Sequence, residues 1–256
     1  MSGRTFLSVA RAELHYRRLG TEFEGTPLVF LHEGLGSVEL WREFADDLVA
    51  RTRRPGLIFS RRGNGWSTPL QSARTPDYMH DEALRTLPEV LEQLVGAPPI
   101  LIGHSDGASI SIIYAGAENS VRALVLIAPH VLTEREGLEA IAAIRQRFTD
   151  SDLAERMAKY HVDPEATFYG WADVWLSPAF RSWNIEEYLP GVTCPTLVVQ
   201  GTDDEYGTMR QIEAIEAGLV VKPQRLIVER AGHSPHLTDP DVVTGTVVDF
   251  IVNLDQ

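Results

Sequence analysis

Residues 100–108 of the chain read Ile-Leu-Ile-Gly-His-Ser-Asp-Gly-Ala. The apolar start of this stretch predicts a strand buried on both faces of a sheet, and the small residues at its end are compatible with a helix. Between them lies the pattern Gly-x-Ser-x-Gly, which is typical of a nucleophile elbow, a sharp turn that exposes a serine. Gly103 and Gly107 remove side chains that would clash in such a turn. We therefore predict that Ser105 is a nucleophile.

Short apolar runs recur on both sides of the elbow and alternate with helical patterns. They are residues 28–31, 57–59, 123–128, 195–201 and 225–228. This alternation predicts a mostly parallel sheet that is covered by helices on both faces. An apolar/polar alternation within Phe6–Arg17 adds one or two antiparallel strands at an edge. The predicted fold class is therefore α/β.

The alternation of strands and helices stops in residues 131–190. This segment shows helical patterns without a strand between them, and it holds nine of the chain's 21 Phe, Trp and Tyr residues. We predict that it is an inserted helical cap. The core domain would then consist of two parts, residues 1–130 and residues 191–256.

Composition limits the kinds of partner. The net charge of −13 disfavours nucleic acid and anionic membranes as partners and favours a small-molecule substrate. The single cysteine, Cys194, cannot form an internal disulfide, so the chain does not require an oxidising compartment. No signal-peptide pattern is present, and no apolar run approaches the roughly 20 residues of a membrane span. We expect a soluble cytoplasmic protein; the sequence does not indicate its oligomeric state.

A serine hydroxyl needs a neighbouring base, which an acid must orient. His233 follows the last predicted strand, and Asp204 follows the strand before it. The order Ser, Asp, His is the one expected when later loops of the same sheet serve an elbow serine, because parallel strands end on a common side. Asp203 and Glu205 are the alternatives for the acid.

Acyl transfer also needs hydrogen-bond donors for the oxyanion. The N–H of Asp106, directly after the nucleophile, is one candidate. The glycine-bearing loop of residues 32–37 is expected to supply the second, from Gly34. Phosphate binding is the rival interpretation of this loop, but the loop lacks the Gly-Lys-Ser/Thr ending of a P-loop.

Five motifs in this order resemble those of cap-bearing serine hydrolases of the α/β-hydrolase superfamily, over nearly the whole chain. They are His32-x-x-x-Gly36-Ser37 with Trp41, Arg62-Gly63-x-Gly65-x-Ser67, the Gly103–Gly107 elbow, Gly201-x-x-Asp204, and Gly232-His233. The resemblance implies an eight-stranded, mostly parallel sheet, an inserted lid, Asp204 as the acid, no metal and no organic cofactor. Within the superfamily the chain is similar to small bacterial carboxylesterases and lactonases, including enol-lactonases.

Two positions depart from that family pattern. Glu33 stands where relatives usually have Gly after the histidine of the oxyanion loop. Its carboxylate either opposes the oxyanion or points away and fixes the loop by a hydrogen bond. We favour the second role, because an ionised group that faces a developing negative charge would raise the barrier. Ser60 replaces a frequent Asp and puts the anchoring of the Arg62–Ser67 turn in question.

Other residues are candidates for the substrate site. Glu33, His130, Trp171 and Trp175 are candidates to line a pocket, although His130 could instead cap a loop and the two tryptophans could form the core of the cap. We expect His104 to pack beside the elbow and His236 to be a supporting or surface residue. His32, His233 and Asp204 lack the short-range spacing of a metal site.

The sequence therefore predicts a serine hydrolase that cleaves a small carboxylic ester or lactone. Hydrolysis of a carbon–carbon bond in a ring-cleavage product would use the same three residues. A ligand-sensing homologue with slow turnover is an alternative from another class, and cofactor-free oxygenation is a further one.

Overall fold

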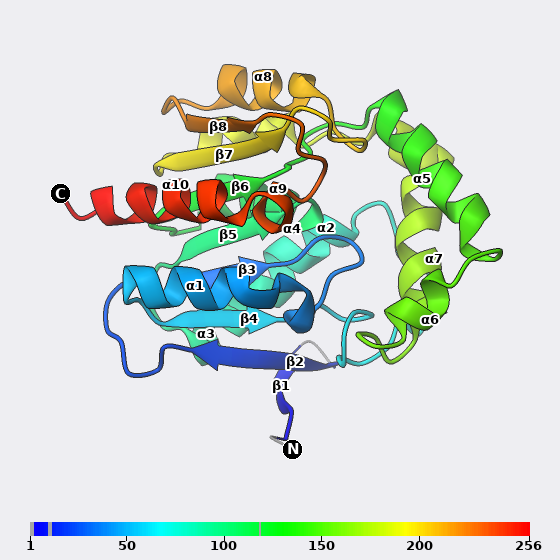
Figure 1. Cartoon of the computed structure of the whole chain (residues 1–256), viewed down its shortest axis with the longest axis horizontal. Coiled ribbons are helices and arrows are strands. Elements are labelled where there is room, and N and C mark those ends of the chain that lie inside the picture. The colour runs from blue at the N-terminus through cyan, green and yellow to red at the C-terminus, as the bar shows by residue number, and fades with distance from the viewer. Residues whose placement is uncertain (1–2, 10–11, 118) are drawn as a thin grey trace.

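One eight-stranded sheet forms the centre of the computed structural model, which describes residues 3–9, 12–117 and 119–256 (Figure 1). The strands are β1 (Thr5–Val9), β2 (Ala12–Leu19), β3 (Leu28–Leu31), β4 (Gly56–Phe59), β5 (Ile100–His104), β6 (Ala123–Ile127), β7 (Thr196–Gly201) and β8 (Gln224–Val228). Their order is β1-β2-β4-β3-β5-β6-β7-β8. The pairs β1/β2 and β2/β4 are antiparallel, and the other neighbours are parallel. The predicted α/β class and the antiparallel edge are confirmed.

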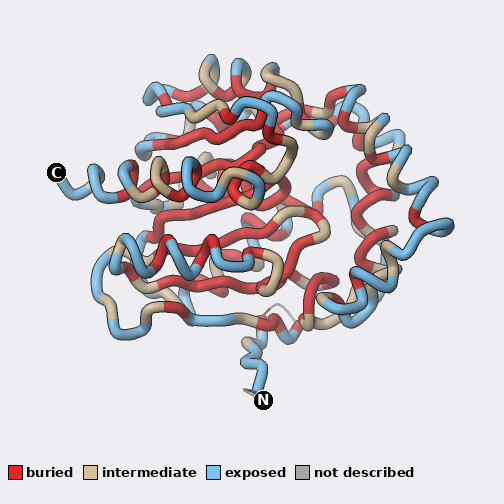
Figure 2. The backbone as a smooth tube through the Cα atoms, viewed as in Figure 1, coloured by how far each residue is buried: buried red, intermediate tan, exposed pale blue. Residues whose placement is uncertain are grey.

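Helices cover both faces of the sheet, and each central strand sends alternate side chains to each face. In β5, Leu101 packs into one core cluster, whereas Ile100 and Ile102 pack into the other. The first cluster includes residues of α2 (Tyr78–Asp81), α3 (Leu87–Leu94), α4 (Asp106–Gly116) and α8 (Met209–Gly218). The second includes η1 (Val38–Trp41), α1 (Arg42–Thr52) and α10 (Pro240–Asn253), and the short α9 (Pro235–Thr238) precedes α10. This two-sided burial explains the continuous apolar runs in the sequence (Figure 2).

The helical stretch before the elbow strand changes geometry near Pro88. A wide π-type turn, η2 (Glu82–Thr86), separates α2 from α3, and Pro88 lies in the first turn of α3. Proline lacks an N–H and fits the first turn of a helix, where N–H groups have no intrahelical partner. Pro88 therefore stands where the regular α-helical geometry of α3 begins.

Residues 131–190 form a helical segment that curves around one side of the sheet (Figure 1). It contains α5 (Arg135–Phe148), α6 (Leu153–Met157), α7 (Pro164–Trp175) and η3 (Pro178–Ser182), and η4 (Glu186–Gly191) closes it. Stacked rings hold it together: the ring centroids of Phe148 and Phe168 lie 3.9 Å apart. Throughout the described part of the chain, no helix is long and apolar enough to cross a membrane.

Candidate active site

Ser105 stands at the turn between β5 and α4 in a backbone conformation that L-residues rarely adopt, with φ 53° and ψ −117°. Its N–H donates to the carbonyl of Ile127 in β6, at 2.9 Å. The neighbouring glycines have no room for a side chain: a Cβ on Gly107 would lie 1.8 Å from the carbonyl oxygen of Leu31, and one on Gly103 would lie 2.4 Å from the carbonyl oxygen of Gly107. The strands on both sides thus fix the sharp turn that the elbow pattern predicts.

The structure brings Ser105, His233 and Asp204 together in one hydrogen-bonded chain. His233 Nε2 lies 2.8 Å from Ser105 Oγ, and His233 Nδ1 lies 2.9 Å from each carboxylate oxygen of Asp204. The Asp204 carboxylate also accepts hydrogen bonds from the Tyr206 N–H and the Gln200 side-chain amide, both at 2.8 Å. Of the three adjacent acidic residues, Asp204 is the one that faces the histidine.

The electrostatics of this chain suit proton transfer. Burial by itself would lower the pKa of His233, but the hydrogen bond and charge of Asp204, with the charges of Glu205 and Glu33, outweigh it and raise that pKa. Burial would raise the pKa of Asp204, but its bonds to His233 and to the Tyr206 N–H outweigh burial and lower it. Asp204 is therefore ionised at neutral pH, where it stabilises a protonated His233.

Both residues predicted to supply oxyanion donors lie close to Ser105: Asp106 follows it in the chain, and Gly34 lines the same cavity. The N–H of Asp106 lies in the first turn of α4, where helix N–H groups have no intrahelical acceptor. Gly34 lies in the loop after β3, and the Asn64 side chain donates to its carbonyl at 2.9 Å. A Cβ on Gly34 would lie only 2.3 Å from the Trp171 ring, so Trp171 packs directly over this loop.

Glu33 lines the cavity at Ser105, and its carboxylate shapes its own loop. Its Oε2 accepts a hydrogen bond from the Leu35 N–H, which fits the shape-fixing role favoured from the sequence. Burial raises the pKa of Glu33 to about 7, although the Leu35 N–H and the charge of Arg61 oppose this rise. At neutral pH the group is therefore close to half protonated.

A cavity of about 220 Å³ opens beside Ser105. All four residues predicted to line a pocket, Glu33, His130, Trp171 and Trp175, lie on its wall. The two tryptophans are also buried in the core, so they serve both of the roles considered for them. Sequence reasoning missed Ile141 and Tyr206 and considered Glu205 only as the acid; the position of Tyr206, two residues after Asp204, was the available signal.

The other histidines near the site are buried. The His130 ring lies 5.4 Å from Trp175 and 5.6 Å from His233, and burial lowers its pKa to about 3, so it forms a neutral wall. His104 packs beside the elbow, with Nε2 2.8 Å from the carbonyl oxygen of His233. His236 is only 2% exposed, between Trp41 and the other rings, so the surface position considered for it is wrong.

A buried polar network beneath the elbow was not anticipated. Tyr78 Oη donates to Asp106 Oδ2 at 2.6 Å and accepts from Trp175 Nε1 at 3.0 Å. Arg61 Nη2 lies 3.8 Å from the same Asp106 oxygen and donates to the Glu33 carbonyl at 3.0 Å. The network joins the elbow, the oxyanion loop and α7. These contacts link residues far apart in sequence, which explains why no local pattern revealed them.

Ser60 anchors the turn that follows β4. Its hydroxyl accepts a hydrogen bond from the Val38 N–H at 2.9 Å, and its carbonyl accepts one from the Ser67 hydroxyl at 2.6 Å. The turn is thus tied to this position through the backbone carbonyl, while the Ser60 side chain is bonded to η1.

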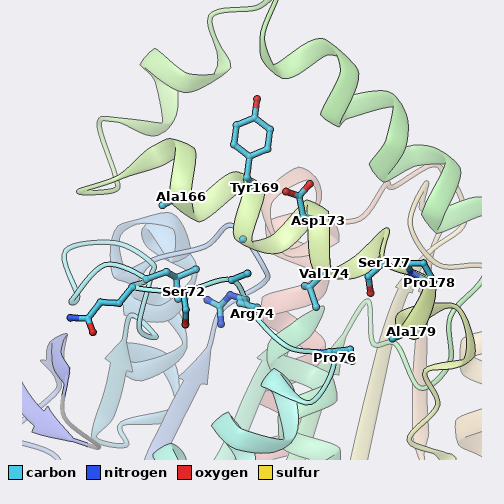
Figure 3. A pocket seen from close by; sticks show the side chains of 14 residues that line it. Ser72, Arg74, Pro76, Ala166, Tyr169, Asp173, Val174, Ser177, Pro178 and Ala179 are labelled. Carbon is cyan, nitrogen blue, oxygen red and sulfur yellow. The ribbon is translucent and has the colours of Figure 1, made fainter.

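A larger groove of about 700 Å³ lies on the other side of α7 (Figure 3). Arg74, Tyr169 and Asp173 line it, whereas Trp171 and Trp175 of the same helix line the cavity at Ser105. The smaller cavity is the candidate active site, because it contains the serine and the histidine. Over the described ranges, no group of three His, Cys, Asp or Glu side chains is placed to hold a metal ion.

Comparisons with known proteins identify the family of the chain. The model of the alpha/beta hydrolase family matches residues 28–246. The serine hydrolase BPHL of Mus musculus is 27% identical over 258 residues, covering 96% of this chain and 85% of that protein. The sn-1-specific diacylglycerol lipase ABHD11 of Danio rerio is 31% identical, but the match spans 53% of this chain and only 43% of the lipase. The solved enol-lactonase of Burkholderia xenovorans superposes with a TM-score of 0.75 at 18% identity, covering 97% of this chain and 100% of that one.

Proposed function

Because the chain belongs to the alpha/beta hydrolase family, we propose that this hydrolase cleaves a small carboxylic ester or lactone through an acyl-enzyme on Ser105. The observation that carries the proposal is the hydrogen-bonded chain from Asp204 through His233 to Ser105, which opens on the cavity. The resemblance to serine hydrolases, esterases and a lactonase supports the same reaction class.

In the first half of the proposed reaction, Ser105 Oγ attacks the carbonyl carbon while His233 Nε2 takes the hydroxyl proton. The negative charge moves to the carbonyl oxygen, where the N–H groups of Gly34 and Asp106 hold it. When the tetrahedral intermediate collapses, the bond to the alkoxy oxygen breaks, and His233 returns its proton to that oxygen. The acyl group stays on Ser105.

In the second half, His233 takes a proton from water, and the resulting hydroxide attacks the acyl carbon. The bond to Ser105 Oγ then breaks, His233 gives the proton back to the serine, and the acid leaves. Asp204 stays ionised throughout and stabilises the imidazolium in both halves. Removing one oxyanion donor would cost on the order of a hundredfold to a thousandfold in rate.

We propose that the helical segment of residues 131–190 acts as a cap that selects the substrate. The support is that α5 supplies Ile141, and α7 supplies Trp171 and Trp175, to the cavity wall. A dry cavity of about 150 Å³ holds a benzene ring, so a cavity of about 220 Å³ accommodates an aromatic ring with one or two further atoms.

Labelling with a fluorophosphonate tests the nucleophile. We expect the native protein to be labelled and Ser105→Ala not to be, while Ser182→Ala, an exposed serine in η3, is labelled like the native protein. Turnover of a panel of esters and lactones should fall at least about ten-thousandfold in Ser105→Ala. A native protein that is neither labelled nor active on the panel contradicts the proposal.

Two outcomes of the same experiment would favour the alternatives. Labelling with negligible turnover across the panel indicates a ligand-sensing homologue. Bleaching of a coloured dienoate substrate, lost in Ser105→Ala, indicates carbon–carbon bond hydrolysis by the same three residues.

A further inference from the structure

The charges on the cavity wall are unequal. Among the described residues that line the cavity, Glu33 and Glu205 carry carboxylates, and no lysine or arginine side chain is present. His130 is neutral at physiological pH because burial lowers its pKa to about 3. With Glu33 and Glu205 ionised, the formal charge of the wall beside Ser105 is negative even when His233 is protonated.

The remaining wall provides faces that attract cations. Trp171, Trp175 and Tyr206 line the cavity, and the rings of Trp171 and Tyr206 meet nearly at right angles, with centroids 6.3 Å apart. Aromatic faces attract ammonium groups, and tryptophan does so most strongly. A carboxylate beside aromatic faces is the combination that recognises an amine rather than an acid.

The two glutamates belong to different loops of the cavity wall. Glu33 adjoins Gly34 in the oxyanion loop, whereas Glu205 is exposed at the rim, with a carboxylate oxygen about 3.2 Å from where a Cβ on Gly232 would stand. Both charges act on the electrostatics of His233 and of Tyr206. Glu33 and Glu205 line the same cavity as Tyr206 and Ser105, so a cationic group bound there lies in the field of both carboxylates.

Two arginines act on these groups from outside the cavity. Arg61 lies behind the oxyanion loop, where its guanidinium donates to the backbone carbonyls of His32 and Glu33. Arg147 is exposed on α5 and acts on Tyr206. Neither of them lines the cavity, so a cationic ligand would not meet an arginine side chain there.

An ionised Glu33 next to the oxyanion loop opposes the negative charge that develops on the substrate during acyl transfer. A positive charge on the substrate, close to Glu33, removes that opposition in the transition state and not only in the bound ester. We infer that the substrates of this site are esters that carry an ammonium group, bound by Glu33 and Glu205 over the rings of Trp171 and Tyr206. This inference rests on the proposed ester hydrolysis.

The protonation of the Glu33 carboxyl group is sensitive to such a ligand. With its pKa near 7, the free group is partly protonated at neutral pH, and an ammonium group would shift it toward the carboxylate. Esters with a carboxylate in the same place would meet two like charges and are expected to be poor substrates.

The test compares esters matched in size and different in charge. On the acyl side these are methyl 4-(aminomethyl)benzoate, methyl 4-ethylbenzoate and monomethyl terephthalate. On the alcohol side they are the acetates of choline and of 3,3-dimethylbutanol. We expect kcat/KM for at least one cationic ester to exceed that of its neutral partner about tenfold or more. We expect the carboxylate ester to be the slowest of its set.

Substitutions of Glu33 and Glu205 test whether their carboxylates cause the preference for cationic esters. Glu33→Gln keeps an oxygen that accepts from the Leu35 N–H, so the loop retains its bond while the charge is lost. We expect the ratio of cationic to neutral kcat/KM to fall severalfold in Glu33→Gln and to a smaller extent in Glu205→Gln. Glu213→Gln removes the same charge from the exposed face of α8 and should leave the ratio unchanged.

The ratio is taken within each variant, so a general loss of folding or activity cancels. Equal kcat/KM for cationic and neutral esters in the native protein, or an unchanged preference in both Glu33→Gln and Glu205→Gln, would overturn this inference and leave ester hydrolysis standing. If instead the proposed ester hydrolysis is wrong, the native protein turns over no ester of either charge and is not labelled by the fluorophosphonate. Inhibition by benzylamine but not by benzoate would support the inference.

Discussion

His233 lies between opposing influences, and its pKa reports their balance. To accept the proton of Ser105, its imidazole must be neutral. Burial favours the neutral form, but Asp204, Glu205 and Glu33 favour the protonated form and raise the pKa above the usual 6.5. His233 is therefore mostly neutral, and able to accept the serine proton, only at a pH above this raised pKa.

The pH dependence of kcat/KM for a neutral ester follows from this balance. We expect an acid limb in which the rate falls about tenfold per pH unit, with its midpoint above 6.5. Glu33→Gln removes a negative charge from beside the imidazole, so the midpoint should move to lower pH. A native midpoint at or below 6.5, or a shift to higher pH in Glu33→Gln, would show that these charges do not control His233.

Gly34 is a second residue at which the packing of the site leaves no room for a side chain. A Cβ there would lie 2.3 Å from the buried ring of Trp171, so either the ring or the oxyanion loop must move. We expect Gly34→Ala to lower kcat/KM on the order of a hundredfold, the effect of misplacing one oxyanion donor. Gly245→Ala is the matched control, because a Cβ in that part of α10 meets nothing within 4 Å. Native-like kinetics in Gly34→Ala would argue against Gly34 as a donor.

At the scale of elements, the elbow depends on backbone packed against backbone. The first turn of α4 approaches β3 so closely that Gly107 lies against the carbonyl of Leu31. Both strands beside β5 are parallel to it and tied to it by regular pairing, so neither can yield without breaking the sheet. The position of Ser105 is therefore a property of three strands and one helix.

Gly107→Ala tests this dependence. The new Cβ would lie 1.8 Å from a main-chain oxygen, and no side chain can rotate out of its way. We expect the free energy of unfolding, measured in urea, to fall by about 1–3 kcal/mol or more. We also expect the variant to lose fluorophosphonate labelling. Gly245→Ala should instead gain about 0.4–1 kcal/mol, because it only restricts the unfolded chain within a helical position. Equal stability of the two variants would refute the packing explanation.

At the scale of the whole molecule, the helical segment and the core domain share one hydrophobic cluster and one polar network. Trp171 and Trp175 of α7 belong to the same buried cluster as the sheet residues below them. The hydrogen bonds from Trp175 through Tyr78 to Asp106 continue this connection to the elbow. One continuous set of contacts therefore joins α7 to the turn that carries Ser105.

A double-mutant cycle between Tyr78→Phe and Trp175→Phe measures that coupling. Tyr78→Phe leaves the buried Trp175 Nε1–H and one Asp106 oxygen without this partner, which costs about 1–3 kcal/mol in the free energy of unfolding. Because both substitutions break the same bond, their effects should fall short of additive by about 1 kcal/mol. Strict additivity would mean that the hydrogen bond contributes nothing to stability.

Features that depend on local pattern could be predicted from the order of the residues alone. Alternating apolar runs predicted the sheet, and the spacing of glycines around Ser105 predicted the elbow, because a turn that sharp excludes side chains. His233 and Asp204 could be found because each follows a strand, and parallel strands end on the same side. The resemblance to a known family then chose Asp204 from three adjacent acids, and the structure places that residue against His233.

The surroundings of the serine, in contrast, become known only from the folded chain. That Tyr206 and Ile141 meet at the cavity, that His236 is buried, and that Arg61 and Tyr78 converge on Asp106 are results of packing between distant segments. The orientation of the Glu33 carboxylate belongs to the same class, because it depends on the fold of its loop and on the burial around it. A linear sequence records which charges are present; their fields at the reacting atoms depend on distance and burial, which exist only in the folded chain.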